Sequence, residues 1–158
     1  MNNKPLAAIN IPPQIKKSAY PEPFASMMQG RNKRKLGDYF GLSNFGINLT
    51  ELQPGAMSAL KHHHLTQDEF IYILNGTPTL VYDDNEYLMQ PGDCFGFPKA
   101  SGIGSQLINK SSELVTYLEI GDRSAGDIGE YPDDDLRAIM QDDASWQFVH
   151  KDGSPYES

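Results

Sequence analysis

The chain has 158 residues, a length that suits one domain with a buried core and is too short for two. Of these residues 39% are hydrophobic and 22% charged, as is ordinary for a globular protein. Its formal net charge of −8 repels phosphate backbones and anionic membrane surfaces, so we expect neither nucleic acid nor a membrane as a partner. The single cysteine, Cys94, excludes an intramolecular disulfide and no apolar run is long enough for a membrane span, so we expect a cytoplasmic protein.

Residues 1–37 are predicted to form an N-terminal arm. Pro12, Pro13, Pro21 and Pro23 interrupt its short apolar pieces, and proline breaks helices and suits extended arms or edge strands. The basic cluster RNKRK at 31–35 is interpreted as a solvated loop ahead of the first strand, in preference to a phosphate-binding patch. We expect the arm to be a segment that two subunits exchange.

Residues 38–122 are predicted to form a β-barrel. Short apolar runs alternate with turns rich in Pro, Gly and Asp, and no helical periodicity lies between them. The expected strands are FGINLTEL, SALKHHH, EFIYILNG, TPTLVYD, EYLMQ, CFGFP, SQLIN and ELVTYLEI. The pattern is typical of an all-β antiparallel sandwich or barrel.

Residues 123–158 are predicted to form a C-terminal arm that packs on the barrel. The segment begins with a polar, turn-rich stretch, DRSAGDIGEYPDDDL. Within it, DLRAIMQ at 135–141 is expected to make one or two helical turns, and WQFVH at 146–150 is expected to return as an edge strand.

The stretch KHHHLTQDEF at 61–70 contains three of the four histidines of the chain. Side chains alternate along a strand, so His62 and His64 should share one face, and Glu69 should lie beside them across a hairpin. Two imidazoles and a carboxylate can hold a divalent ion. The alternative is an exposed polar strand end, but a glutamate in the apolar strand EFIYILNG has little reason to be there unless it is paired.

Two segments resemble the conserved motifs of the cupins. Residues 55–76, GAMSALKHHHLTQDEFIYILNG, are similar to the first motif, and residues 92–109, GDCFGFPKASGIGSQLIN, are similar to the second. The resemblance extends over about residues 38–136 and is to small bacterial single-domain cupins with the type-2 conserved barrel. It implies a jelly-roll barrel, also called a double-stranded β-helix.

The resemblance also implies a metal site, with one ligand missing. His62, His64 and Glu69 match the first-motif ligands, but the second-motif histidine falls on Ser105, with Gln106 beside it. Ser105 could donate to a metal-bound water, and Gln106 could ligate through its amide oxygen if the register slips by one. The donor set does not select a metal, so iron, zinc, manganese and nickel all stay open.

Two classes of function follow from this resemblance. The first is a metal-dependent enzyme acting on a small molecule, an oxygenase, decarboxylase or isomerase, with dioxygenase-like chemistry favoured. The second is a non-catalytic barrel that binds a small molecule or sugar, with an empty or structural metal site. No catalytic residue or substrate is assigned. The apolar residues on both faces of strand 69–74 indicate an exterior face that needs a cover, and we expect a homodimer.

Overall fold

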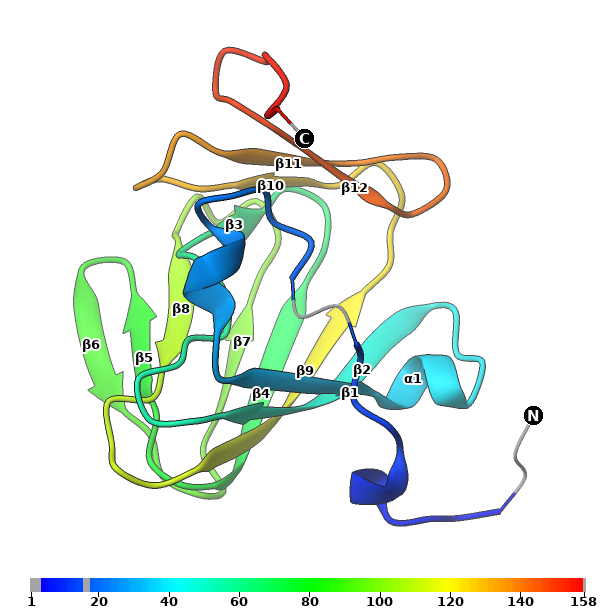
Figure 1. Cartoon of the computed structure of the whole chain (residues 1–158), viewed down its shortest axis with the longest axis vertical. Helices are drawn as coiled ribbons and strands as arrows, with labels where there is room; N and C mark the ends of the chain where they lie inside the picture. Colours follow the sequence, from blue (N-terminus) through cyan, green and yellow to red (C-terminus); the bar gives the residue numbers. More distant parts are fainter. Residues whose placement is uncertain (1–3, 16–17, 158) are drawn as a thin grey trace.

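The computed structural model describes residues 4–15 and 18–157. Twelve strands in these ranges form three antiparallel sheets (Figure 1), which confirms the expected all-β jelly-roll architecture. The helices are single turns that connect or precede strands, at Ala8–Asn10 (η1), Ala25–Met28 (η2) and Leu36–Tyr39 (α1).

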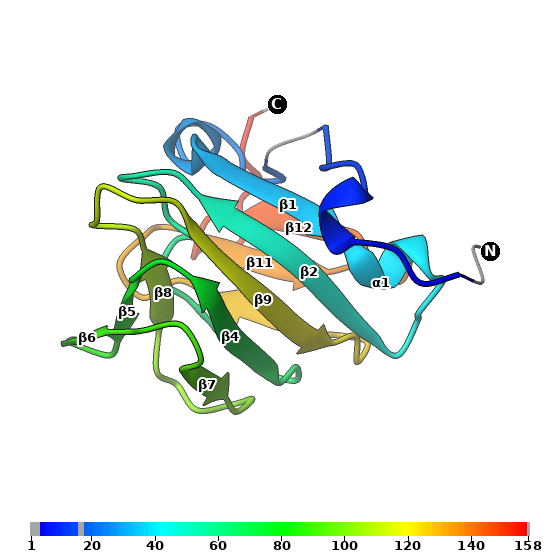
Figure 2. The same cartoon turned by 90° about the horizontal axis from the view of Figure 1, so that it is seen from below.

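The largest sheet has five strands in the order β1-β2-β9-β4-β7. Figure 2 shows these strands side by side. Their bounds are Arg31–Lys35 (β1), Phe45–Leu52 (β2), Val115–Asp122 (β9), Glu69–Asn75 (β4) and Cys94–Phe97 (β7). The RNKRK segment is therefore the edge strand β1, paired with β2 along its whole length, and the interpretation as a solvated loop is wrong. Local sequence gave no sign of this because the pairing partner, β2, supplies the hydrogen bonds.

Two smaller sheets complete the fold. A three-stranded sheet, β6-β5-β8, contains Asn85–Leu88 (β6), Thr79–Tyr82 (β5) and Ser105–Ile108 (β8). A four-stranded sheet, β12-β11-β10-β3, crosses one end of the molecule (Figure 1) and contains Trp146–Val149 (β12), Arg137–Met140 (β11), Ile128–Glu130 (β10) and His63–His64 (β3). The edge strand expected at WQFVH is confirmed as β12. The helical turns expected at DLRAIMQ are wrong, because residues 137–140 pair with β10 and β12 as β11.

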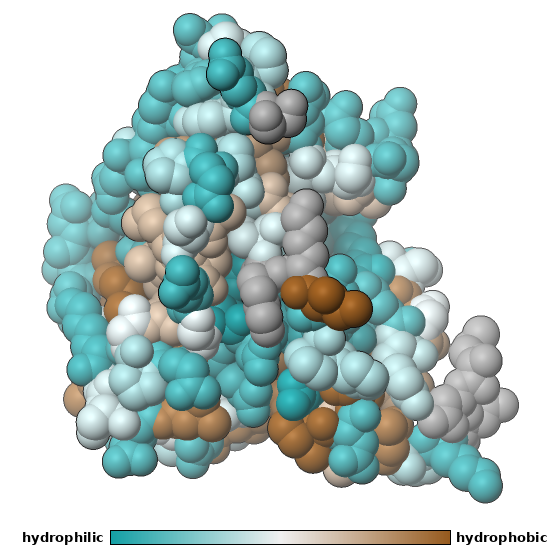
Figure 3. All heavy atoms as spheres, viewed as in Figure 1, coloured by the Kyte–Doolittle hydropathy of each residue, from teal (hydrophilic) through white to brown (hydrophobic). Residues whose placement is uncertain are grey.

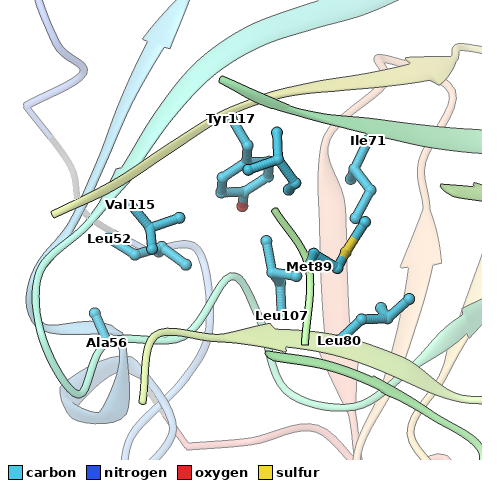
Figure 4. Close-up of a cluster of buried hydrophobic side chains, with 9 residues drawn as sticks. Leu52, Ala56, Ile71, Leu80, Met89, Leu107, Val115 and Tyr117 are labelled. Carbon is cyan, nitrogen blue, oxygen red and sulfur yellow. The ribbon is translucent and has the colours of Figure 1, made fainter. Parts of the chain in front are cut away.

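The apolar core lies between the five-stranded and three-stranded sheets. Figure 4 shows its side chains converging from both sheets and their connections, and the cluster comprises Leu52, Ala56, Ile71, Ile73, Leu80, Met89, Leu107, Val115 and Tyr117. The outer face drawn in Figure 3 is largely hydrophilic. A second cluster lies under the four-stranded sheet and comprises Met28, Leu60, Tyr131, Leu136 and Ala138.

On β4 and β8 the inward side chains change from polar at the start of the strand to apolar further along it. On β4, Glu69 precedes the buried Ile71 and Ile73 on the same face, and on β8, Ser105 precedes the buried Leu107. The polar members therefore gather at the end of the barrel that the four-stranded sheet crosses. This end holds the candidate site.

Gly76 shows why the strand after the site must end in glycine. Its backbone has a φ of 79°, and an added Cβ would lie 2.6 Å from the carbonyl oxygen of Leu114. A side chain at this position would therefore meet both an unfavourable backbone conformation and a backbone atom. The glycine that closes the first motif thus lets β4 leave the sheet beside the start of β9.

Candidate metal centre

His62, His64 and Glu69 come together although His64 and Glu69 belong to different sheets and His62 lies just before β3, bridged to Ser105. His64 lies on β3, opposite Gly129 of β10, whereas Glu69 opens β4, opposite Gly121 of β9. β3 and β4 are not paired, so the expected hairpin between them is wrong. The three side chains meet because the four-stranded sheet crosses the mouth of the barrel. One ligand atom from each of the three lies within 4.8 Å of the other two.

The hydrogen bonds of the two imidazoles occupy Nδ1 of each ring and leave Nε2 to bind a metal ion. His62 Nδ1 lies 2.7 Å from the carbonyl oxygen of Leu60, which can only accept, so Nδ1 carries the proton. His64 Nδ1 lies 2.5 Å from Oδ2 of Asp127, and the same assignment follows. Both Nε2 atoms then carry a lone pair, and that of His64 lies 3.5 Å from Glu69 Oε1.

Asp127 was missed by the sequence analysis. It is fully buried just before β10, and its other oxygen accepts hydrogen bonds from the backbone N–H (2.8 Å) and the hydroxyl (3.0 Å) of Thr66. Burial by itself raises the pKa of Asp127, but the hydrogen bonds from His64 and Thr66 lower it below its ordinary value. Asp127 is 63 residues from His64 in the chain, so no local pattern links them.

The surroundings shift the pKa values of His62 and His64 in opposite directions. Burial lowers the pKa of His62 below its ordinary value, although the charge of Glu69 acts to raise it. Burial also acts to lower the pKa of His64, but the hydrogen bond to Asp127 and the charge of Glu69 raise it above its ordinary value. His62 is therefore held neutral, as a ligand must be, while His64 is held in place by a carboxylate.

The donor set fits a divalent cation. Two imidazoles and one carboxylate are ligands that zinc, iron and similar ions accept, with bonds of ~2.0–2.2 Å. Two ligands of one ion are then at most ~4.4 Å apart, so the widest pair here, within 4.8 Å, needs a movement of only a few tenths of an ångström. The buried carboxylate behind His64 also matches the partner that metal-bound histidines usually have.

Ser105 and Gln106 point to opposite sides of β8. Ser105 is 8% exposed, shares the inward face with Leu107, and its backbone exchanges hydrogen bonds with that of His62 (2.9 and 3.1 Å). Gln106 donates from its amide nitrogen to the carbonyl oxygen of Ala59 (3.1 Å). Ser105 therefore lies beside the histidines, at the position where the resemblance places an imidazole. Roles for Ser105 or Gln106 toward a metal stay predictions.

A cavity of about 610 Å³ opens from these residues across the inner face of the five-stranded sheet. Three cationic side chains from alternate positions of β1, Arg31, Lys33 and Lys35, line it, whereas Asn32 and Arg34 do not. The period of a strand explains this division, because every second side chain faces the same side.

Glu119, on the inward face of β9, is a partly buried acid of this cavity. Its Oε1 atom accepts from Lys33 Nζ (2.6 Å), Asn48 Nδ2 (3.1 Å) and Thr50 Oγ1 (3.1 Å), and Oε2 accepts from the Tyr117 hydroxyl (3.3 Å). Burial raises the pKa of Glu119, but Lys33 and Asn48 lower it further than burial raises it. The carboxylate is thus ionised and held by four donors.

Aromatic rings form the opposite wall. Tyr131 stacks on His62 with ring centroids 5.3 Å apart, and its hydroxyl lies 3.3 Å from that of Tyr20. Trp146 of β12 meets His64 edge-on at 6.0 Å. Burial raises the pKa of both tyrosines, so their hydroxyls are neutral hydrogen-bonding groups. The C-terminal strands therefore form part of the site.

Comparison with known proteins supports the same fold. The family model described as Cupin domain matches residues 48–121. A crystal structure of a sugar phosphate isomerase from a cupin superfamily, from Silicibacter pomeroyi DSS-3, is 38% identical, with a TM-score of 0.91 and 98% of each chain covered. A structure from Acidithiobacillus ferrooxidans, described provisionally as a sugar phosphate isomerase, is 30% identical, with a TM-score of 0.71 and 81% of each chain covered.

More distant structures share the fold alone. The polyketide cyclase RemF from Streptomyces resistomycificus is 19% identical, with a TM-score of 0.60, and the match covers 75% of this chain and 78% of RemF. No curated protein matches the chain. Within residues 4–15 and 18–157, no helix is both long and apolar enough to cross a membrane.

Proposed function

This chain belongs to the cupin superfamily, and from that premise we propose that it binds a divalent metal ion through His62, His64 and Glu69 and isomerises a phosphorylated sugar. The convergence of two imidazoles and a carboxylate on the wall of a large cavity carries this proposal. The reaction type is chosen because two similar structures, 38% and 30% identical to this chain, are described as a sugar phosphate isomerase, the second of them provisionally.

The chain's own groups would hold the ion and orient the sugar. A divalent ion in this position would polarise a carbonyl group and the hydroxyl beside it. His62 and His64 present Nε2 to the ion because Leu60 and Asp127 hold their Nδ1 protons. The rings of Tyr131 and Trp146 cover this end of the cavity, which limits the access of water.

Glu119 is the group we assign to proton transfer. Converting an aldose to a ketose moves a proton from C2 to C1, while a hydroxyl proton passes between the neighbouring oxygens, so a base is needed and no other reactant is consumed. Glu119 faces the cavity opposite Ile71, one diagonal step across the sheet from Glu69. Its Oε2 atom accepts only the 3.3 Å bond from Tyr117 among the hydrogen bonds described above, so this oxygen can take the proton.

The test combines metal analysis with nuclear magnetic resonance. Protein purified without a metal-affinity tag should contain about one divalent ion per chain and should interconvert a sugar phosphate in D₂O, with deuterium entering at C2. Glu119→Gln should lower kcat by about 10²–10⁴-fold, the usual contribution of a general base. The exposed Glu113→Gln is the matched control and should be unchanged. A metal-free chain, or no reaction with a panel of aldose and ketose phosphates, would contradict the proposal.

The other chemistries stay untested predictions. Substrate-dependent oxygen uptake would support the oxygenase interpretation, and release of carbon dioxide would support a decarboxylase. Ligand binding by protein that holds no metal would support the non-catalytic barrel. A cytoplasmic location and the division into residues 1–37, 38–122 and 123–158 likewise stay predictions.

We also propose that the chain forms a homodimer through the outer face of β4. Phe70, Tyr72 and Leu74 on this face are 37%, 40% and 44% exposed, next to one another on alternate positions. Light scattering after gel filtration should show a dimer for the wild type and a monomer for Tyr72→Lys. A monomeric wild type at micromolar concentration would contradict this interface. Exchange of the N-terminal arm between subunits stays a prediction.

A further inference from the structure

The cationic face of β1 is the feature of the cavity that the reaction described above does not use. We propose that Arg31, Lys33 and Lys35 bind the phosphate of a monophosphate ester whose sugar part lies toward His62, His64 and Glu69. The inference rests on the proposed function, because it names the part of the same cavity that holds the phosphate. A phosphorylated sugar carries its carbonyl group and its phosphate at opposite ends, so its pocket needs two different polar ends.

The strand period brings the cations to one side. Arg31, Lys33 and Lys35 line the cavity, while Arg34 points to the other side of the sheet, where NH1 lies 3.9 Å from Glu51 Oε2. The five basic and polar residues of RNKRK are thus divided by their geometry into an inward and an outward set.

Burial distinguishes Arg31 and Lys33 from surface cations. Arg31 is 8% exposed, and the side chain of Lys33 is 20% exposed. Buried cations are costly to keep unless an anion compensates them. Glu119 is the carboxylate that contacts Lys33, and Arg31 donates to the neutral carbonyl oxygen of Ser58 (2.5 Å). Arg31 and Lys33 both act on Glu119, and the phosphate of a ligand would give these two cations a second anionic partner.

Lys33 is directed toward the metal end. Its strand lies at the edge of the sheet, yet its ammonium group reaches over β2 to Glu119 on β9, which is the strand next to β4. An ammonium group has three N–H donors, and Glu119 takes one of them. Lys33 can thus contact the phosphate of a ligand whose sugar reaches Glu69 at the start of β4. Lys35 lies at the rim with its side chain 53% exposed, and its ammonium group is 3.8 Å from Asp38 Oδ2, so it is the weakest of the three phosphate contacts.

The negative net charge of the chain means that phosphate would bind only at a particular group of cations. A chain with a formal charge of −8 repels phosphate in general, so phosphate binding requires a local group of cations. Arginine and lysine are also the side chains that form charge-assisted hydrogen bonds with phosphate oxygens. Within the described residues, β1 supplies three such side chains to one cavity.

Calorimetric titration of the full, metal-loaded chain with inorganic phosphate tests the inference. Lys33→Met should weaken phosphate binding by about 10- to 100-fold, as expected for the loss of a hydrogen bond between charged groups. Arg34→Met, one residue away on the opposite side of β1, is the matched control and should bind within about threefold of the wild type. Equal dissociation constants for the two variants, or a wild type that binds no phosphate at millimolar concentration, would overturn the inference.

Two further variants separate this site from folding and from the metal. Lys33→Met leaves Glu119 buried without its cation, so the double variant Lys33→Met with Glu119→Gln removes both charges, and its melting curve shows whether it folds. This double variant should still lack phosphate binding. The metal-free double variant His62→Ala with His64→Ala should retain it. If phosphate binding is instead lost with the metal and kept in Lys33→Met, phosphate binds the ion and the inference is wrong.

A comparison of fructose 6-phosphate with fructose then identifies the group that is recognised. Lys33→Met should weaken binding of the phosphate ester and leave binding of the neutral sugar unchanged. Equal effects on both would contradict a phosphate site. A wild type that binds the ester through Lys33 but does not isomerise it would contradict the proposed function and would support the phosphate site.

Discussion

Replacing Asp127 by asparagine tests whether a buried carboxylate prepares His64 to bind a metal. Asp127 accepts from His64 Nδ1 at 2.5 Å and from both donors of Thr66 at 2.8 and 3.0 Å. Asparagine keeps an oxygen for Thr66 but turns its amide group toward His64. A good hydrogen bond then requires Nδ1 to accept, so the ring proton moves to Nε2, the atom that lies 3.5 Å from Glu69.

Asp127→Asn should lower the metal affinity by more than it lowers the stability of the metal-free chain. A metal must displace the proton from Nε2, and changing such a partner lowers metal affinity by about 10- to 100-fold, which is ~1.4–2.8 kcal/mol. The free energy of unfolding of the metal-free chain should fall by only about 1 kcal/mol, because the hydrogen bonds re-form with reversed polarity. Asp127→Ala leaves buried donors of His64 and Thr66 unpaired, at a cost of ~1–3 kcal/mol for each group.

Competition with a chelator of known affinity measures the first quantity, and urea unfolding measures the second. The control is Asp135→Asn, which alters a second His–Asp pair, with His150 Nδ1 2.8 Å from Asp135 Oδ2 on the exposed surface. That variant should bind metal as the wild type does. If Asp127→Asn bound the metal within about twofold of the wild type, the carboxylate would not set the ring proton of His64, and this reasoning would be refuted.

Three further predictions follow from the same contacts. His62→Ala should reduce the metal content of tag-free protein to background. His63→Ala should leave the metal content unchanged, because the side chain of His63 points to the other side of the strand. Equal metal contents of the two variants by mass spectrometry would contradict the assignment of His62 as a ligand. The pKa of Glu119 is lowered from its ordinary 4.5, so Glu119 adds stability that is complete above that pH and is lost as the pH falls through the lowered pKa. Urea unfolding should therefore show a steeper acid loss for the wild type than for Glu119→Gln, and parallel curves would argue against the pairing with Lys33. Leu107→Ala should lower the free energy of unfolding by ~2–5 kcal/mol, because Leu107 is only 3% exposed. The control Leu88→Ala should lower it by ~0.5 kcal/mol or less, because Leu88 is 65% exposed. Equal losses for the two variants would show that Leu107 does not belong to the core.

Strand patterns and motif spacing determined much of the barrel. The segments FGINLTEL, EFIYILNG and SQLIN are strands β2, β4 and β8, because their periodicity and bounding turns are local properties of the chain. The convergence of His62, His64 and Glu69 was also expected, but for a partly wrong reason. The expected hairpin does not exist, and β3 pairs with β10 instead.

The sequence by itself determined which residues alternate on each strand and therefore which side chains share a face. Only the tertiary structure decided which faces meet. Asp127 reaches His64 across 63 residues, and the basic run at the start of β1 turns three cations toward the same cavity. These contacts depend on the order of strands in the sheets, which the hydrogen bonds and packing of distant segments settle together and no local pattern encodes.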